Sequence, residues 1–304
     1  MNQKIYFAVR EMGDVYALTT IIEYCIEANI AIEWHIVPFS VNSDLSLCQF
    51  TDIIGKYRNA KIEDAPRDEQ TLKCVNIFGF STDMKHQLEK IIQPVISVYD
   101  INVARRDIVN VAQVNKKKPW IVVGNIKLKS PIEDFQYPIL QKLSLLPYKV
   151  ILVPRHPLTT EEAQKINLPV NLTLDNSMGK LVQLYAQADL TIMGKIFSVD
   201  RFEFDDGDHN PLEATISSNT ICIRSKISDA YKEFYELSGL MHCFNNHLDS
   251  FEVIDKLIYD PSLKKKLQWR KKWIEKNRQT NLQQAIKKLG IYTKYIIKRE
   301  YSTA

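Results

Sequence analysis

The sequence lacks the patterns that hold zinc or a disulfide framework. Its five cysteines, Cys25, Cys48, Cys74, Cys222 and Cys243, lie far apart and include no CxxC pair. The six histidines include no HExxH or comparable metal pair. Zinc sites and disulfide-linked small folds need such closely spaced ligands or thiols, so the sequence argues against both. We expect the cysteines to be small buried apolar residues.

A membrane-spanning run and a secretion leader are also missing. The longest apolar zone, residues 17–37, is broken by Glu23, Glu27 and Glu33, so it cannot cross a bilayer. Residues 2–6 run directly into a strand-like segment, with no basic-then-apolar leader before them. We therefore expect a protein of the cytoplasm.

Length and composition favour a globular protein of two domains. The chain has 304 residues, of which 45% are hydrophobic and 25% charged. Its net charge of +4 is uneven, because residues 262–300 hold thirteen Lys or Arg against Glu275 and Glu300. A basic tail of this kind can meet nucleic acid, an anionic membrane surface or only solvent.

Strand and helix patterns alternate along most of the chain. A strand at 4–9, apolar residues at helical spacing from Val15 and a strand at 30–37 predict a βαβ beginning. The charged run 115–119, which ends in proline, predicts a domain boundary. Weak alternation near 72–80 and 94–103 flanks a helical stretch near 82–92. Beyond the boundary we expect strands at 120–123, 149–153, 170–174, 189–193 and 220–224, with helices at 160–166, at 180–187 and after Pro211. This rhythm predicts parallel α/β sheets, in which ligands collect beyond the carboxyl ends of the strands.

Residues 207–215 combine the parts of an anion-binding helix start. Gly207 permits a turn, Asn210 suits the N-cap, Pro211 suits the first helical position, and Glu213 lies in the first turn. Free backbone N–H groups at such a start can face a phosphate or carboxylate. Alternatively, Asn210 and Glu213 form only a capping box.

Four short segments occur in order through the second half of the chain. They are Gly124-Asn125-Ile126-Lys127, Pro154-Arg155-His156-Pro157, Met178-Gly179-Lys180-Leu181 followed by residues 184–189, and Gly207-Asp208-His209-Asn210-Pro211-Leu212-Glu213. Together they resemble the Kdo transferases, the GT-B glycosyltransferases that add 3-deoxy-D-manno-octulosonic acid to lipid A precursors in lipopolysaccharide biosynthesis. The likeness covers residues 120–245.

This resemblance implies a GT-B-like α/β fold, with two Rossmann-like domains whose parallel sheets face a cleft. We expect a reduced N-terminal, acceptor-side domain at 1–118, a nucleotide-sugar-binding domain at 119–278, and a final helix at 279–304 that crosses back to the first domain. The resemblance assigns the binding of the sugar donor to eight residues: Asn125, Lys127, Arg155, His156, Gly179, His209, Asn210 and Glu213. The stripe of Leu181, Leu184 and Tyr185 is expected to be core.

The resemblance also places a catalytic base near the first strand. Residues 11–14 align with the family's Ser-Val-Gly-Glu loop, so Asp14 stands where the family has glutamate. A carboxylate there can take the proton of an acceptor hydroxyl. Alternatively, Asp14 is only a helix N-cap. No metal and no cofactor are expected, because basic groups and a helix N-terminus can stabilise the leaving phosphate.

The expected activity is inverting transfer of Kdo or a related acidic sugar from a CMP-activated donor to a glycolipid or glycan. The basic cluster of this tail could dock on anionic lipid at the inner face of the plasma membrane. Its members are Lys264, Lys265, Lys266, Arg270, Lys271 and Lys272, interleaved with Trp269 and Trp273. Nucleic acid is not an expected partner. Lys180, Asp208 and an insertion at 195–206 depart from the family pattern. Two alternatives therefore remain: a non-catalytic GT-B-like binding protein and a GT-B-like sugar-nucleotide epimerase.

Overall fold

The structure is a computed structural model of the whole chain. It describes residues 3–10, 12–38, 50–63, 76–81, 91–108, 119–126, 128, 132, 134, 136–155, 157–177, 179–194, 210–223, 231–244 and 247–291. At positions 81, 125, 194 and 247 only the backbone is described. The chain divides into two compact units: unit 1 is 1–106 together with 274–304, and unit 2 is 107–273.

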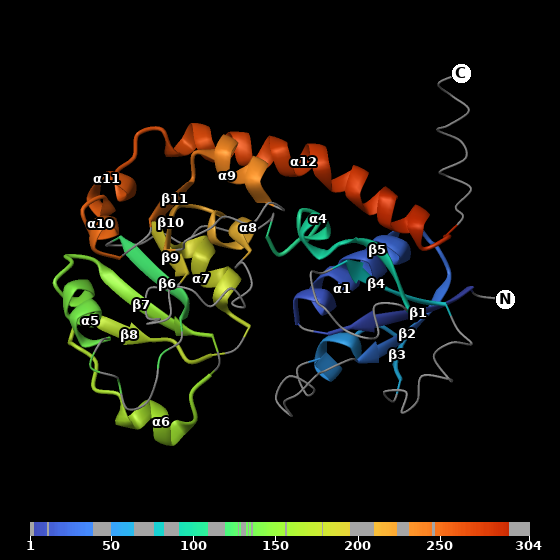
Figure 1. The fold of residues 1–304 in the computed structure, drawn as a ribbon, viewed down its shortest axis with the longest axis horizontal. Helices are drawn as coiled ribbons and strands as arrows, with labels where there is room; N and C mark the ends of the chain where they lie inside the picture. Colours follow the sequence, from blue (N-terminus) through green and yellow to red (C-terminus); the bar gives the residue numbers. More distant parts are fainter. Residues whose placement is uncertain are drawn as a thin grey trace. The chain divides into compact units, whose positions relative to one another are not determined.

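Unit 1 contains a parallel five-stranded sheet in the order β3-β2-β1-β4-β5 (Figure 1). Its elements are β1 (Gln3–Val9), α1 (Met12–Glu27), β2 (Ile32–Pro38), β3 (Ala60–Ile62), β4 (Ile77–Ser81), β5 (Ile92–Ser97) and α4 (Val98–Asn102). Alternate residues of β1 and β2, such as Phe7 and Trp34, enter a core shared with Leu18 and Ile21 of α1. This βαβ beginning is the one that the apolar spacing predicts.

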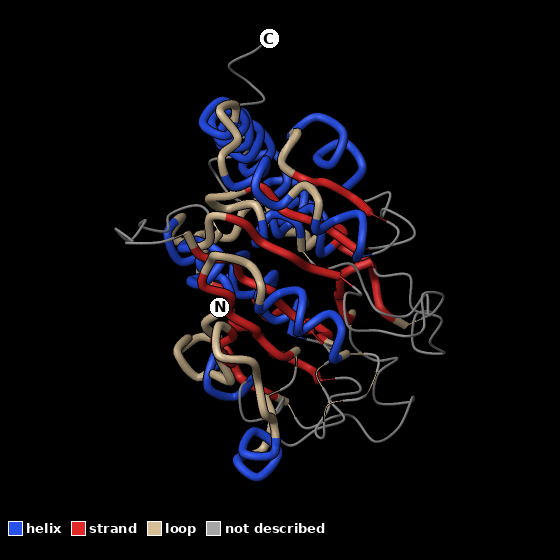
Figure 2. The backbone as a smooth tube through the Cα atoms, turned by 90° about the vertical axis from the view of Figure 1, so that its left-hand side faces the viewer, coloured by secondary structure: helices blue, strands red, loops and turns tan. Residues whose placement is uncertain are grey.

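Unit 2 contains a parallel six-stranded sheet in the order β11-β10-β9-β6-β7-β8. Its strands, red in Figure 2, are β6 (Trp120–Ile126), β7 (Lys149–Pro154), β8 (Leu172–Leu174), β9 (Leu190–Gly194), β10 (Asn219–Ile223) and β11 (Met241–Phe244). Its helices are α5 (Tyr137–Ser144), α6 (Thr160–Lys165), α7 (Leu181–Gln187), α8 (Pro211–Ala214), α9 (Lys232–Ser238), α10 (His247–Phe251) and α11 (Ile254–Ile258).

The predicted strands and helices of the second half are confirmed to within a few residues. The alternation near 94–103 indicates an extended strand, and this prediction was wrong in part because β5 ends at Ser97. The hydroxyl oxygen of Ser97 accepts a hydrogen bond from the Tyr99 amide and caps α4, so the chain turns helical there. The predicted helical stretch near 82–92 lies mostly outside the described residues, and Ile92 at its end begins β5.

The last described helix, α12 (Leu263–Lys288), begins in unit 2 and ends in unit 1. Its later part adds Leu282, Ala285 and Ile286 to the core of unit 1. None of the helices in the described part of the chain combines the length and apolar character that a bilayer crossing requires.

Candidate functional site

The strand order places a topological switch point in each sheet. In unit 2, the chain runs outward from β6 to β7 on one side and returns on the other side with β9. In unit 1, β1 and β4 hold the same positions. Ligands of open parallel sheets bind beyond the carboxyl ends of the strands at such points. The carboxyl ends of β6 and β9 are therefore the place to look for a site in unit 2.

Three of the four sequence segments meet at the carboxyl end of β6. A Cβ on Gly124 would lie 2.0 Å from the Tyr185 hydroxyl oxygen, so only glycine leaves room for this ring. Tyr185 is 2% exposed. Burial, followed by the negative charge of Glu213, raises the pKa of Tyr185. Gly124 of β6, Tyr185 of α7 and Glu213 of α8 are thus neighbours, and the expectation that Tyr185 is core is confirmed.

The second segment joins the first through the backbone. The amide of Arg155, directly after β7, donates to the carbonyl of Ile126 at 2.8 Å. Arg155 is only partly buried, and its guanidinium has the fork that binds carboxylates and phosphates. The chain order of the strands therefore brings Arg155 to the same edge of the sheet as Gly124.

Asn210 is the N-cap of α8, as its place before Pro211 predicts. Its side-chain oxygen Oδ1 accepts from the amide of Leu212 at 3.0 Å and from the Tyr231 hydroxyl at 3.4 Å. Its amide nitrogen Nδ2 is buried and has no hydrogen-bond partner among the described residues. A buried donor of this kind costs free energy unless an acceptor arrives. The hydrogen-bonding capacity of Asn210 Nδ2 is therefore unused among the described residues.

Buried Arg270 of α12 holds α8 in place. Its Nη2 donates to the carbonyls of Leu212 at 2.7 Å and Ile108 at 3.2 Å, and its Nε donates to Thr215 Oγ1 at 3.3 Å. Burial lowers the pKa of Arg270 to about 10, which leaves the guanidinium charged at neutral pH. This role could not be seen in the basic run that contains Arg270. The sequence signal is the apolar Ile274 one helical turn later, which lies on the same buried face of α12 as Arg270.

The basic cluster predicted to meet lipid is therefore divided. Arg270 is 5% exposed, so it was wrongly placed on a docking face. Lys266 donates to Asp260 at 2.7 Å. Trp269 and Trp273 both contact the ring of Phe234, with centroids 5.9 and 5.2 Å apart. The exposed members of the cluster are Lys264, Lys265, Lys271 and Lys272.

Asp14 lies in the first turn of α1, just beyond β1 in unit 1. Its Oδ2 accepts from the Arg10 amide at 2.9 Å and lies 3.8 Å from the Arg10 Nε. Asp14 is 1% exposed. The alternative of a simple N-cap was wrong in position, because α1 begins at Met12 and Asp14 is its third residue.

Several of the residues predicted to bind the sugar donor lie wholly or partly outside the described structure. Lys127, His156 and His209 lie outside the described residues, as does the insertion at 195–206, and Asn125 is described by its backbone in β6. Gly179 precedes α7 with a φ of +77°, a left-handed conformation that favours glycine.

The absence of a metal stays a prediction. Within the described ranges, no three His, Cys, Asp or Glu side chains gather as a metal site requires. The triplet Asp206-Gly207-Asp208 has the spacing of acidic metal motifs, and it lies outside those ranges.

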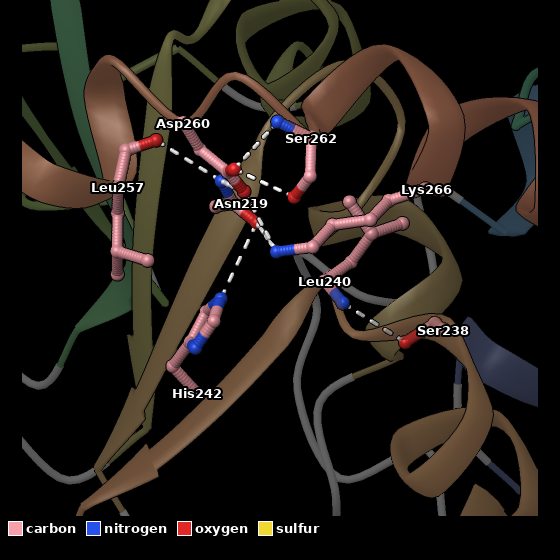
Figure 3. Close-up of polar contacts among 8 residues, drawn as sticks. All are labelled: Asn219, Ser238, Leu240, His242, Leu257, Asp260, Ser262 and Lys266. Carbon is pink, nitrogen blue, oxygen red and sulfur yellow. Dashed lines mark hydrogen bonds and ion pairs between the residues drawn. The ribbon is translucent and has the colours of Figure 1, made fainter.

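A second polar cluster lies at the amino end of β10, away from the strand ends where ligands collect. Figure 3 shows Asn219, the first residue of β10, surrounded by His242, Asp260 and Lys266. Asn219 Nδ2 donates to Asp260 Oδ2 at 2.9 Å and to the Leu257 carbonyl at 3.0 Å. Burial and the Lys266 charge lower the pKa of His242. The cluster ties the start of α12 to the sheet, which is a structural role.

Comparison with known proteins supports the fold. No family model and no curated protein matches the sequence, but solved structures do. CalG4, the calicheamicin glycosyltransferase, has a TM-score of 0.54 at 9% identity, covering 95% of this chain and 98% of that chain. The glycosyltransferase of kitacinnamycin has a TM-score of 0.53 at 10% identity, covering 93% and 97%. The spinosyn forosaminyltransferase SpnP has a TM-score of 0.50 at 9% identity, covering 91% and 96%. The chain therefore has an α/β fold of two parallel sheets that matches GT-B glycosyltransferases.

Proposed function

We propose that the chain is a glycosyltransferase that binds a nucleotide-activated sugar in unit 2. The observation that carries this proposal is the fold, which matches glycosyltransferases over 91–95% of the chain. The meeting of Gly124, Tyr185 and Glu213 at the switch point of unit 2 supports it. A fold alone does not give an activity, so the residues at this edge must be tested directly.

Asn210 and Arg155 supply the groups that a charged donor needs. The buried Nδ2 of Asn210 would donate to a donor oxygen, because its Oδ1 is already occupied by Leu212 and Tyr231. The Arg155 fork would hold a carboxylate or phosphate. An acidic sugar on CMP, as in the Kdo transferases, fits this pair, and the four ordered segments are the reason for naming it.

Asp14 is the base in this proposal. It would accept the proton of an acceptor hydroxyl as that oxygen attacks the anomeric carbon, which gives inversion. The acceptor would be a glycolipid or another glycan, and the exposed lysines of α12 could lie against anionic lipid.

A second candidate, a non-catalytic sugar-nucleotide-binding protein, is favoured by one observation. Asp14 is 1% exposed and accepts from the Arg10 amide, an arrangement that can stabilise the start of α1 without any chemistry. The two candidates share the donor site and differ in turnover.

Calorimetric titration of the whole chain with CMP, UDP and GDP tests the donor site. We expect CMP alone to bind, with the same affinity after chelation of divalent ions. Binding of none of the three would refute the donor assignment, and binding that requires Mg²⁺ or Mn²⁺ would refute metal independence and point to Asp206 and Asp208.

Asn210→Ser separates binding from folding. Serine is an equally good N-cap, so thermal stability should hold. It also removes the Nδ2 donor without adding a charge, so CMP affinity should fall by roughly tenfold to a hundredfold, since a hydrogen bond to a charged group contributes about 1.5–3 kcal/mol. Unchanged affinity would remove Asn210 from the site.

Asp14→Asn tests the base. With a CMP-sugar donor and a glycan acceptor, kcat should fall by about 10²–10⁴ while CMP affinity stays the same. If the wild-type chain binds CMP but turns over no acceptor, the non-catalytic candidate is supported. If Asp14→Asn keeps full activity, Asp14 only orders the start of α1.

A further inference from the structure

Two cysteines lie opposite each other on neighbouring strands of unit 2. Cys222 of β10 and Cys243 of β11 are register partners in a parallel pair. Neighbouring strands lie about 4.8 Å apart, and partners in register project to the same face of the sheet. Disulfides need a Cα separation of roughly 4.4–6.8 Å. The backbone therefore already has the separation that a disulfide requires.

The two thiols contact each other but differ in access. Cys222 is 1% exposed, whereas Cys243 is exposed, so the expectation that every cysteine is buried was wrong for Cys243. β11 lies at an end of the strand order, and Cys243 is the one exposed residue of this strand. A hydrogen bond joins the thiols, and this bond together with burial raises the pKa of Cys222. Cys222 thus stays a protonated thiol at neutral pH.

This arrangement gives the two sulfurs different roles. The thiolate is the form that attacks disulfides, and burial disfavours this form at Cys222. Cys243 is also the sulfur that a reagent in solution can reach. Cys222 is protected from solvent and lies against Cys243, which is the position of a resolving thiol.

We propose that Cys222 and Cys243 form a reversible thiol–disulfide pair in which Cys243 is the attacking thiol. The oxidant is a small-molecule disulfide, such as oxidised glutathione. The Cys243 thiolate attacks one sulfur of that disulfide, forms a mixed disulfide and releases one glutathione thiolate. Cys222 then loses its proton and attacks the Cys243 sulfur, releasing the second glutathione.

The overall exchange is balanced. The two cysteines lose two electrons and two protons, and oxidised glutathione gains both to become two glutathione thiols. The two sulfurs that form the disulfide belong to β10 and β11, which are already paired. The exchange therefore needs only a local adjustment of these two strands.

Mass spectrometry of the full chain in glutathione redox buffers tests the proposal. After free thiols are alkylated, proteolysis should show a Cys222–Cys243 linked peptide that disappears on reduction. Cys222→Ala should stop at a glutathione adduct on Cys243, and Cys243→Ala should leave Cys222 unmodified. Cys25→Ala, which removes a buried cysteine of unit 1, is the matched control and should keep the link. Circular dichroism of the reduced variants checks their folding.

Three outcomes would overturn the proposal. They are a wild-type chain that stops at the Cys243 adduct, a link from Cys243 to Cys48 or Cys74 instead, and a Cys222 adduct in Cys243→Ala. Each would show that the two sulfurs do not react as a pair.

Discussion

Replacement of Arg270 tests whether the basic helix is built for solvent or for the core of unit 2. In Arg270→Met, an apolar side chain of similar length takes the place of the guanidinium. The carbonyls of Leu212 and Ile108 lose the donors that now lie 2.7 and 3.2 Å away. Thr215 Oγ1 loses its contact with Nε but still donates to the Pro211 carbonyl at 2.7 Å, so it is not orphaned.

The two carbonyls set the expected magnitude. A buried acceptor left without a donor costs about 1–3 kcal/mol, which gives about 2–6 kcal/mol for the pair. Removal of a buried charge returns part of this, because the guanidinium was desolvated on folding. We therefore expect a net loss of about 2–4 kcal/mol in the free energy of unfolding of unit 2.

Urea unfolding followed by tryptophan fluorescence measures this loss, because Trp269 and Trp273 lie on the same helix. Lys272→Met is the matched control: Lys272 is exposed, and its replacement should change stability by less than about 0.5 kcal/mol. Arg270→Lys keeps the charge but loses the fork, so it should lie between the two. If Arg270→Met is as stable as Lys272→Met, Arg270 does not anchor α8.

Two further changes probe the site and the structural cluster. Gly124→Ala would place a Cβ 2.0 Å from the Tyr185 hydroxyl oxygen; overpacking of this kind costs about 1–3 kcal/mol, so the melting temperature should fall, and an unchanged one would mean that Tyr185 moves freely. Burial alone would raise the pKa of Asp260. Hydrogen bonds from Lys266, Ser262 and Asn219 nevertheless hold this pKa well below its ordinary value. The stability that Asp260 contributes is therefore present above about pH 4, its unfolded pKa, and is lost as pH falls through the lower folded value. Asp260→Asn should be less stable than wild type at pH 7, with a difference that shrinks below about pH 4; a constant difference from pH 2 to pH 7 would contradict this linkage.

The strands and helices could be predicted because they depend on neighbours in sequence. Buried parallel strands read as short apolar runs, and the face of α1 shows in the spacing of Leu18, Ile21 and Cys25. The cap at Asn210 was readable for the same reason, since an N-cap and the proline after it act over a few residues. The segment near 94–103 failed where a local signal was overlooked, because Ser97 caps a helix within a pattern taken for a strand.

Residue patterns were thus enough for the α/β class, for strands β6 to β10 and for the strand ends where a site can form. Only the tertiary structure decided which distant side chains meet. It buried Arg270 against Leu212 and Ile108, set Tyr185 against Gly124 and aligned Cys222 with Cys243. These contacts depend on the strand order and on the packing of helices over the sheets. Sequence periodicity predicts neither the strand order nor this packing, because it indicates which face of an element is buried and not what that face is buried against.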